Sequence, residues 1–172
     1  MAGHNILVED RVAARWDGRS LRSIALGTLV AGTLDISAAI LRWLPQGVSA
    51  TRVLQSIAGG LLGRETFAGG APTAALGLLL HFSIMSVIVT VFYVASRRLP
   101  ALTRHWLRYG VAYGAAVYSV MTFIVVPLSA LHAPMPSPSA IAQVLMVHIV
   151  CVGLPIAFIT RRFSQPAPFA GD

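Results

Sequence analysis

Lysine is absent from this chain of 172 residues, and arginine supplies all 13 of its basic side chains. Acidic residues are also scarce, at six, so that only 11% of the residues are charged whereas 56% are hydrophobic. A soluble domain carries about 25% charged residues. The polar side chains are too few to cover a water-facing surface. This excludes an ordinary soluble globular domain and predicts that most of the outer surface faces lipid.

Other features of enzymes and of nucleic-acid-binding proteins are missing as well. Cys151 is the single cysteine, which excludes an internal disulfide and a metal site built from cysteines alone. No phosphate-cradling loop, nucleotide motif or paired nucleophile and base is found, which favours a protein that is not an enzyme. The net charge of +7 comes from arginines at the ends of apolar runs, where they indicate membrane topology rather than nucleic-acid binding.

Four apolar stretches are long enough to cross a bilayer, whose hydrocarbon core needs about 20 helical residues. The second is the clearest, because no formally charged residue occurs from Ala74 to Ala95 and two arginines follow at once. We predict spans at about 23–44, 74–96, 106–128 and 139–160. In the third, Gly110 and Gly114 have the spacing of a helix-contact motif, and Pro127 is expected to kink or end the helix.

The segments outside the spans are predicted from their polarity. Apolar residues on one face of about 49–63 indicate a short amphipathic helix lying in the membrane interface, with a re-entrant segment as the alternative. Residues 1–20 are expected to form a cytoplasmic amphipathic segment, 21–162 the transmembrane domain, and 163–172 a disordered cytoplasmic tail.

The arginines predict the orientation. With the N-terminus in the cytoplasm, ten arginines fall inside and three outside, as the positive-inside rule requires. The predicted fold is therefore all-α, a polytopic up-down bundle of four transmembrane helices with both termini cytoplasmic. The arginines expected to contact lipid headgroups are Arg97, Arg98, Arg104, Arg161 and Arg162.

Three ionisable residues interrupt the apolar runs at similar depths. At a rise of about 1.5 Å per residue, Asp35 and His81 lie roughly 13 Å below the outer ends of their spans, and His148 roughly 15 Å. Tyr118 and Thr122 bracket the same height in the third span. An ionisable side chain in hydrocarbon is costly and is a functional hypothesis by default. We therefore predict an intramembrane polar layer made of these five residues.

The chemistry of this layer leaves several roles open. The residues can join helices by hydrogen bonds, or an Asp–His pair can relay protons or bind an ion. His81 and His148 can also ligate a transition metal or a haem iron. No pair of ligands has a metal-specific spacing, so no cofactor is predicted, and haem or a metal stays an alternative.

Short motifs resemble those of small four-helix bacterial inner-membrane proteins that include the YagU-like group. They are Leu80-His81-Phe82, Tyr113-Gly114, Val126-Pro127-Leu128, His148 and Arg161-Arg162, and the similarity covers about residues 55–162. The resemblance implies a bacterial inner membrane and four helices, and it implies no biochemical activity.

The sequence thus predicts a non-enzymatic integral membrane bundle or accessory subunit. Its partners are the lipid bilayer and either further copies of itself or a larger membrane complex, without nucleic acid. The alternatives are a small proton- or ion-coupled transporter or channel that acts as an oligomer, a haem- or metal-binding redox subunit, and an intramembrane enzyme acting on lipid or quinone.

Overall fold

The computed structural model describes residues 17–132 and 137–164, and all regular structure in these ranges is helical. Most of the predicted N-terminal segment, 1–20, and of the predicted tail, 163–172, therefore lies outside the described residues. The first described helix, α2 (Gly18–Trp43), begins five residues before the predicted first span. The last, α9 (Leu154–Ser164), includes the first two residues of the predicted tail.

Four helices are long and apolar enough to cross a membrane, and each contains one of the predicted spans. The prediction of four apolar helices is confirmed. The first is α2 with the turn η1 (Leu44–Gln46), and the second is α4 (Gly70–Arg98). The third comprises α6 (Trp106–Val120), η3 (Met121–Val125) and α7 (Val126–Leu128). The fourth comprises α8 (Pro138–Val147), η4 (His148–Gly153) and α9.

Side-chain caps begin three of the helices. At the start of α2, Asp17 Oδ1 accepts a hydrogen bond from the backbone N–H of Ser20 at 2.9 Å. Ser49 and Ser137 cap the helices that follow them in the same way. Such a cap supplies an acceptor to a backbone N–H group that has no partner within its own helix. Local sequence therefore sets these helix starts.

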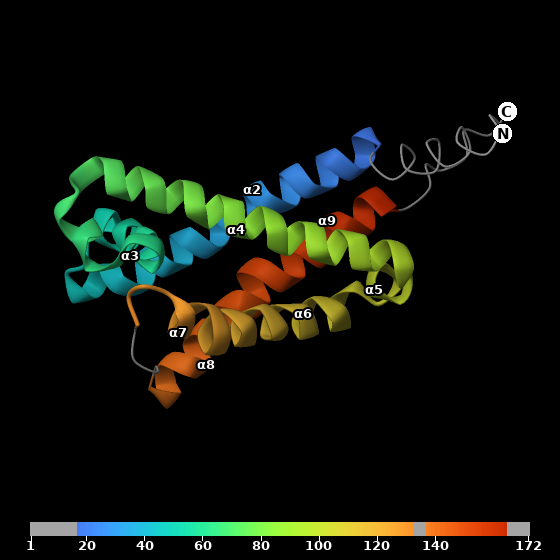
Figure 1. Cartoon of the computed structure of the whole chain (residues 1–172). Helices are drawn as coiled ribbons and strands as arrows, with labels where there is room; N and C mark the ends of the chain where they lie inside the picture. Colours follow the sequence, from blue (N-terminus) through green and yellow to red (C-terminus); the bar gives the residue numbers. More distant parts are fainter. Residues whose placement is uncertain (1–16, 133–136, 165–172) are drawn as a thin grey trace, which may run out of the picture.

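The four long helices share one apolar core. α2 packs along α4 and α9, and α6 packs along η4 and α9. Figure 1 shows α9 crossing α4, and α4 and α6 are not among the closely packed helix pairs of the described residues. The core draws side chains from all four helices, namely Ala31, Met85, Val89, Phe92, Val117, Val152, Ile156 and Ala157.

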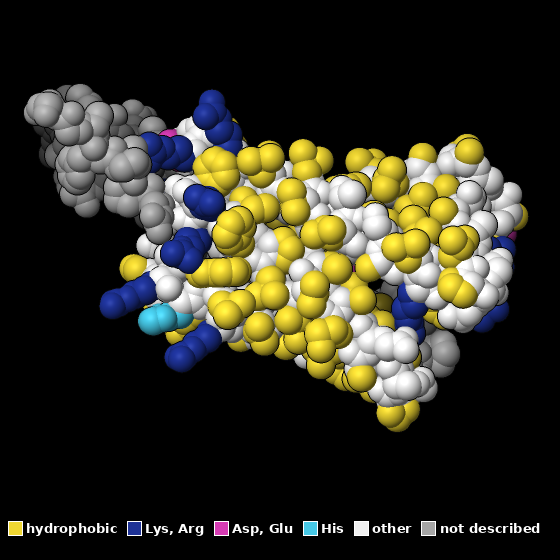
Figure 2. All heavy atoms as spheres, turned by 180° about the vertical axis from the view of Figure 1, so that it is seen from behind, with side chains coloured by type: hydrophobic (Ala, Val, Ile, Leu, Met, Phe, Trp, Pro, Cys, Tyr) yellow, Lys and Arg dark blue, Asp and Glu magenta, His cyan; other side chains and the backbone are white. Residues whose placement is uncertain are grey.

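On the face shown in Figure 2, apolar side chains cover much of the helices between two arginine-bearing ends. Large apolar side chains stand exposed in the middle of the helices, among them Leu29 at 57%, Leu79 at 65% and Val87 at 61%. A soluble protein scatters such residues singly over a polar surface. A continuous apolar belt on helices of this length fits a lipid environment.

A short helical unit covers one end of the bundle. It consists of α3 (Ala50–Leu62) and η2 (Gly63–Ala68), and α3 packs mainly against α4. The buried Gln55 donates hydrogen bonds to Gly70 O at 3.1 Å and to Thr73 Oγ1 at 3.2 Å. A helix is thus present at Ala50–Leu62, within the predicted segment 49–63, and it is fastened to the start of α4. Its position in the membrane interface stays a prediction.

The π-helical segments η3 and η4 each end two residues before a proline. Pro127 follows η3, and Pro155 follows η4. A proline inside a helix has no N–H to donate, and its ring clashes with the carbonyl of the residue four positions earlier. A wider turn before the proline relieves this clash. The kink expected at Pro127 therefore takes the form of a π turn.

Small residues allow α6 and η4 to touch through their backbones. A Cβ atom added at Gly114 would lie 2.6 Å from Ile149 Cα and 2.7 Å from His148 O. On the other helix, a Cβ at Gly153 would collide with the backbone of Gly110 and Gly114. The glycine pair singled out in the sequence is therefore a helix contact, and Gly153 is its partner.

Candidate functional site

His81, the first predicted site residue, is buried and joins two helices. Its Nε2 atom lies 2.9 Å from the carbonyl oxygen of Gly32 on α2. A carbonyl oxygen only accepts, so Nε2 carries the proton and Nδ1 is the acceptor nitrogen in the neutral ring. Phe82 packs edge-on against the imidazole, with ring centroids 5.3 Å apart. His81 thus fixes α4 against α2 at Gly32, which lies one turn before Asp35 on α2.

Asp35, the only acidic residue of the predicted layer, is half-buried on α2. Within the described ranges, no hydrogen bond joins Asp35 to either histidine of the predicted layer. An Asp–His pair, one of the roles that the sequence leaves open, is therefore not hydrogen-bonded among the described residues.

His148 and Tyr118 do meet, across the contact between η4 and α6. Their rings are 5.7 Å apart between centroids and stand edge to face. His148 Nδ1 lies 2.9 Å from Val144 O in the preceding turn of its own helix, so this nitrogen carries the proton. Nε2 is then the acceptor nitrogen of the neutral ring.

The Tyr118 hydroxyl is the most unusual group of the site. The residue is 3% exposed, and its hydroxyl has no hydrogen-bond partner among the described residues. An unpaired buried hydroxyl typically lowers stability by about 1–3 kcal/mol. Thr122 follows one turn later, half-buried in η3. This part of the bundle thus combines a histidine, a buried phenol and two π turns, a backbone feature often found at functional sites.

The structure therefore brings together part of the predicted layer. Tyr118 and His148 are in contact, whereas His81 pairs with a backbone carbonyl and Asp35 lies half-buried on α2. In the part of the chain that the structure describes, no group of three His, Cys, Asp or Glu side chains is placed to hold a metal ion. Each histidine has one ring nitrogen left for a ligand, so the haem and metal alternative stays a prediction.

Tyr113 is a polar contact that the sequence analysis did not select. Its hydroxyl donates to Ile88 O on α4 at 2.6 Å, and its ring packs against Phe92 with centroids 4.9 Å apart. This hydrogen bond bridges α6 and α4 beside an apolar groove of about 240 Å³. The sequence signal for this contact is a tyrosine in the middle of an apolar span, because a buried tyrosine hydroxyl needs a hydrogen-bond partner.

The arginines predicted to contact lipid lie at one end of the molecule. They form the last turn of α4, end the short helix α5 (Ala101–Arg104) and lie in the last turn of α9. Figure 1 shows these segments together with the start of α2. Four of them are exposed, whereas Arg161 is half-buried. Figure 2 shows arginines clustered at this end and fewer at the other.

Comparison with protein-family models, with curated proteins and with solved structures finds no match to this chain. A role for the chain is therefore inferred from the geometry of the described residues.

Proposed function

We propose that this chain is a non-enzymatic scaffold or accessory subunit of a bacterial cytoplasmic membrane, crossing it four times as an up-down bundle with both termini inside. The α3 helix lies in the outer interface in this proposal. The distribution of arginines supports the orientation, since eight of the described arginines lie at the end formed by α5 and three at the end formed by α3. The resemblance to the YagU-like group stays part of the proposal.

The observation that carries the scaffold role is the use of polar side chains inside the bundle. His81 and Tyr113 each hydrogen-bond a main-chain carbonyl of a neighbouring helix, at 2.9 Å and 2.6 Å. Both therefore hold helices in register, which is what intramembrane hydrogen bonds do at a modest gain of about 0.6 kcal/mol each on average. Because both side chains bond to main-chain carbonyls, neither hydrogen bond pairs a nucleophile with a base or an acid with a base.

Proton flux in proteoliposomes tests the scaffold role. The full chain is reconstituted with a pH-sensitive dye inside the vesicles and compared with its Asp35→Asn variant. We expect neither protein to raise proton permeability above that of empty liposomes. A flux that the wild type supports and the Asp35→Asn variant abolishes would contradict the scaffold role.

One observation favours a second candidate, a proton- or ion-coupled role that would require an oligomer. The Tyr118 hydroxyl is buried without a partner among the described residues, and it lies beside His148, whose Nε2 is the acceptor nitrogen of the neutral ring. In the same flux assay, this candidate predicts that Tyr118→Phe and His148→Gln abolish transport. Tyr113→Phe, which removes a hydroxyl already bonded to Ile88, is the matched control.

A redox role for the two histidines is tested by spectroscopy. Protein purified in mild detergent would show a Soret band if it holds haem, and metal analysis would detect a bound transition metal.

A further inference from the structure

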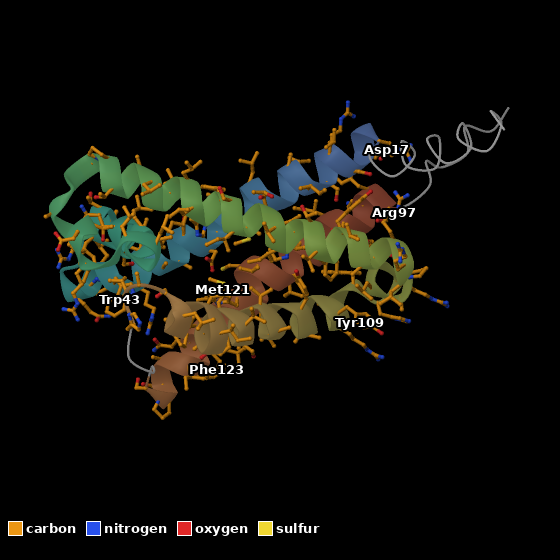
Figure 3. All side chains as sticks on the ribbon, viewed as in Figure 1. Asp17, Trp43, Arg97, Tyr109, Met121 and Phe123 are labelled. Atoms are coloured by element: carbon orange, nitrogen blue, oxygen red, sulfur yellow. The ribbon has the colours of Figure 1, made fainter. Side chains whose placement is uncertain are left out.

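A polar pocket of about 370 Å³ opens at the arginine-rich end of the molecule. Its wall is formed by the start of α2, the end of α4, the turn into α5 and the end of α9. Figure 3 shows two of the lining residues, Asp17 and Arg97, at this end, at the start of α2 and the end of α4. None of the residues of the predicted intramembrane layer lines the pocket.

A hydrogen-bonded network holds the wall in place. Asp17 Oδ1 accepts from both the backbone N–H and the hydroxyl of Ser20, at 2.9 Å and 2.6 Å. The Ser20 hydroxyl is also 2.7 Å from the hydroxyl of Tyr93, which is 3% exposed. This network fixes the start of α2 to α4, so the pocket wall is formed before any ligand arrives.

The charges on the pocket wall favour an anion. Arg19 and Arg97 line it with two positive charges, against the single negative charge of Asp17. Among the described residues, the Arg97 guanidinium makes one hydrogen bond, a long one of 3.5 Å to the Tyr93 hydroxyl. A guanidinium has five N–H donors in a planar fork, so both arginines can bind two oxygens of one phosphate.

The position of the pocket indicates the source of that phosphate. The pocket lies at the ends of helices that are long and apolar enough to cross a membrane. The ends of helices that cross a bilayer meet the lipid headgroups. Pro100 and Phe163 give it an apolar side next to the arginines. We propose that this pocket binds the phosphate of an anionic phospholipid headgroup. The two pocket arginines hold the phosphate oxygens, and the glycerol lies against the apolar side.

The chain offers a matched control for each pocket arginine. Arg22 lies one turn after Arg19 on α2, and Arg108 lies near the start of α6 at the same end of the molecule, yet neither lines the pocket. The double variant Arg19→Gln/Arg97→Gln and the double variant Arg22→Gln/Arg108→Gln therefore remove the same charge from the same end of the molecule. All four side chains are exposed, so both variants are expected to fold.

The test is a titration of the full chain in detergent with short-chain phosphatidylglycerol, followed by native mass spectrometry. We expect the pocket double variant to bind at least about tenfold more weakly than the wild type, the equivalent of one charge-assisted hydrogen bond. We expect the control double variant to stay near the wild-type affinity. Equal weakening in both variants would assign the binding to diffuse charge and overturn the proposal, as would no weakening in either.

A competition arm separates the lipid from a soluble anion. Inorganic phosphate is added to the wild-type protein already loaded with phosphatidylglycerol. Retention of the lipid supports a headgroup site. Displacement by inorganic phosphate would overturn the lipid assignment and leave a pocket for a free phosphate.

Discussion

Two tyrosines on the same helix illustrate how differently one hydroxyl can act at the residue scale. Tyr113 donates its hydroxyl to Ile88 O at 2.6 Å across to α4. Tyr118, buried to 3% exposure, has no partner for its hydroxyl among the described residues. In an apolar interior a paired hydroxyl stabilises the fold and an unpaired one destabilises it.

This difference predicts opposite effects for the same substitution. We expect Tyr113→Phe to lower the free energy of unfolding by about 1 kcal/mol, because Ile88 O loses its donor. We expect Tyr118→Phe to leave it unchanged or to raise it by about 1 kcal/mol, because an unpaired polar group is removed. Unfolding of the detergent-solubilised chain by increasing SDS measures both. Equal losses in the two variants would show that the Tyr118 hydroxyl has a partner.

The residue scale also shows what sequence reasoning can find in such a chain. His81 and His148 stand out because titratable groups are rare in apolar spans. Their partners were not foreseen, because each residue turns a helix by about 100° and the spans were placed only to within a few residues. An error of that size decides whether His81 faces Asp35 or the carbonyl of Gly32. Similar depth along three helices therefore does not determine whether Asp35, His81 and His148 face one another.

At the scale of the element, the contact between α6 and η4 depends on glycine. A Cβ at Gly114 would lie 2.7 Å from His148 O and 2.6 Å from Ile149 Cα, so neither helix can move aside without a backbone shift. The same helices carry the two π turns that precede Pro127 and Pro155. The prolines and Gly110 and Gly114 were recognisable in the sequence. The position of Gly153 opposite Gly114 could not be recognised in the sequence, because it depends on how the helices pack.

Two single glycine-to-alanine variants test this contact. We expect Gly114→Ala to lower the free energy of unfolding by about 1–3 kcal/mol, as overpacking does in a tight interior. Gly18→Ala is the control, because nothing lies within 4 Å of an added Cβ at that position. Alanine there is expected to be neutral or stabilising by up to about 1 kcal/mol. A tolerated Gly114→Ala, measured by the same SDS titration, would mean that α6 and η4 are not in backbone contact.

The start of α2 predicts a pH effect. The hydrogen bond from the Ser20 side chain is the main cause that lowers the pKa of Asp17, and the Ser20 backbone N–H and the nearby Arg97 and Arg19 act in the same direction. A group whose folded-state pKa is lowered stabilises the fold above its unfolded-state pKa. This stabilisation is lost as the pH falls below about 4, through the lowered pKa.

Hydrogen exchange of the Ser20 amide checks this effect. We expect its protection, corrected for the intrinsic exchange rate, to fall as the pH drops below about 4 in the wild type. Asp17→Asn is the control, because asparagine caps a helix about as well as aspartate but does not titrate. A parallel loss of protection in the wild type and in the Asp17→Asn variant would exclude Asp17 as the cause.

At the scale of the whole molecule, charge and aromatic residues define two ends separated by an apolar belt. Trp43 lies near the end formed by α3 and Tyr109 towards the end formed by α5, and each is 39% exposed (Figure 3). Aromatic residues gather in this way at the two faces of a bilayer. The number of spans was predictable because it depends only on length and composition. The apolar groove lined by α4 and α6 was not predictable from the sequence, because it results from how the helices pack against one another.

The most direct test of the account is the sidedness of three matched positions, Ala68, Ala101 and Ala130, which are all exposed. The backbone N–H of Ala130 donates to Gly60 O at 2.9 Å, so this position belongs to the α3 end together with Ala68, whereas Ala101 lies in α5. Each alanine is changed singly to cysteine in a Cys151→Ser background. A membrane-impermeant maleimide is then applied to right-side-out and to inverted membrane vesicles. We expect Ala68→Cys and Ala130→Cys to react only from the outside and Ala101→Cys only from the cytoplasmic side, whereas labelling of all three from the same side would contradict a chain that crosses the membrane four times.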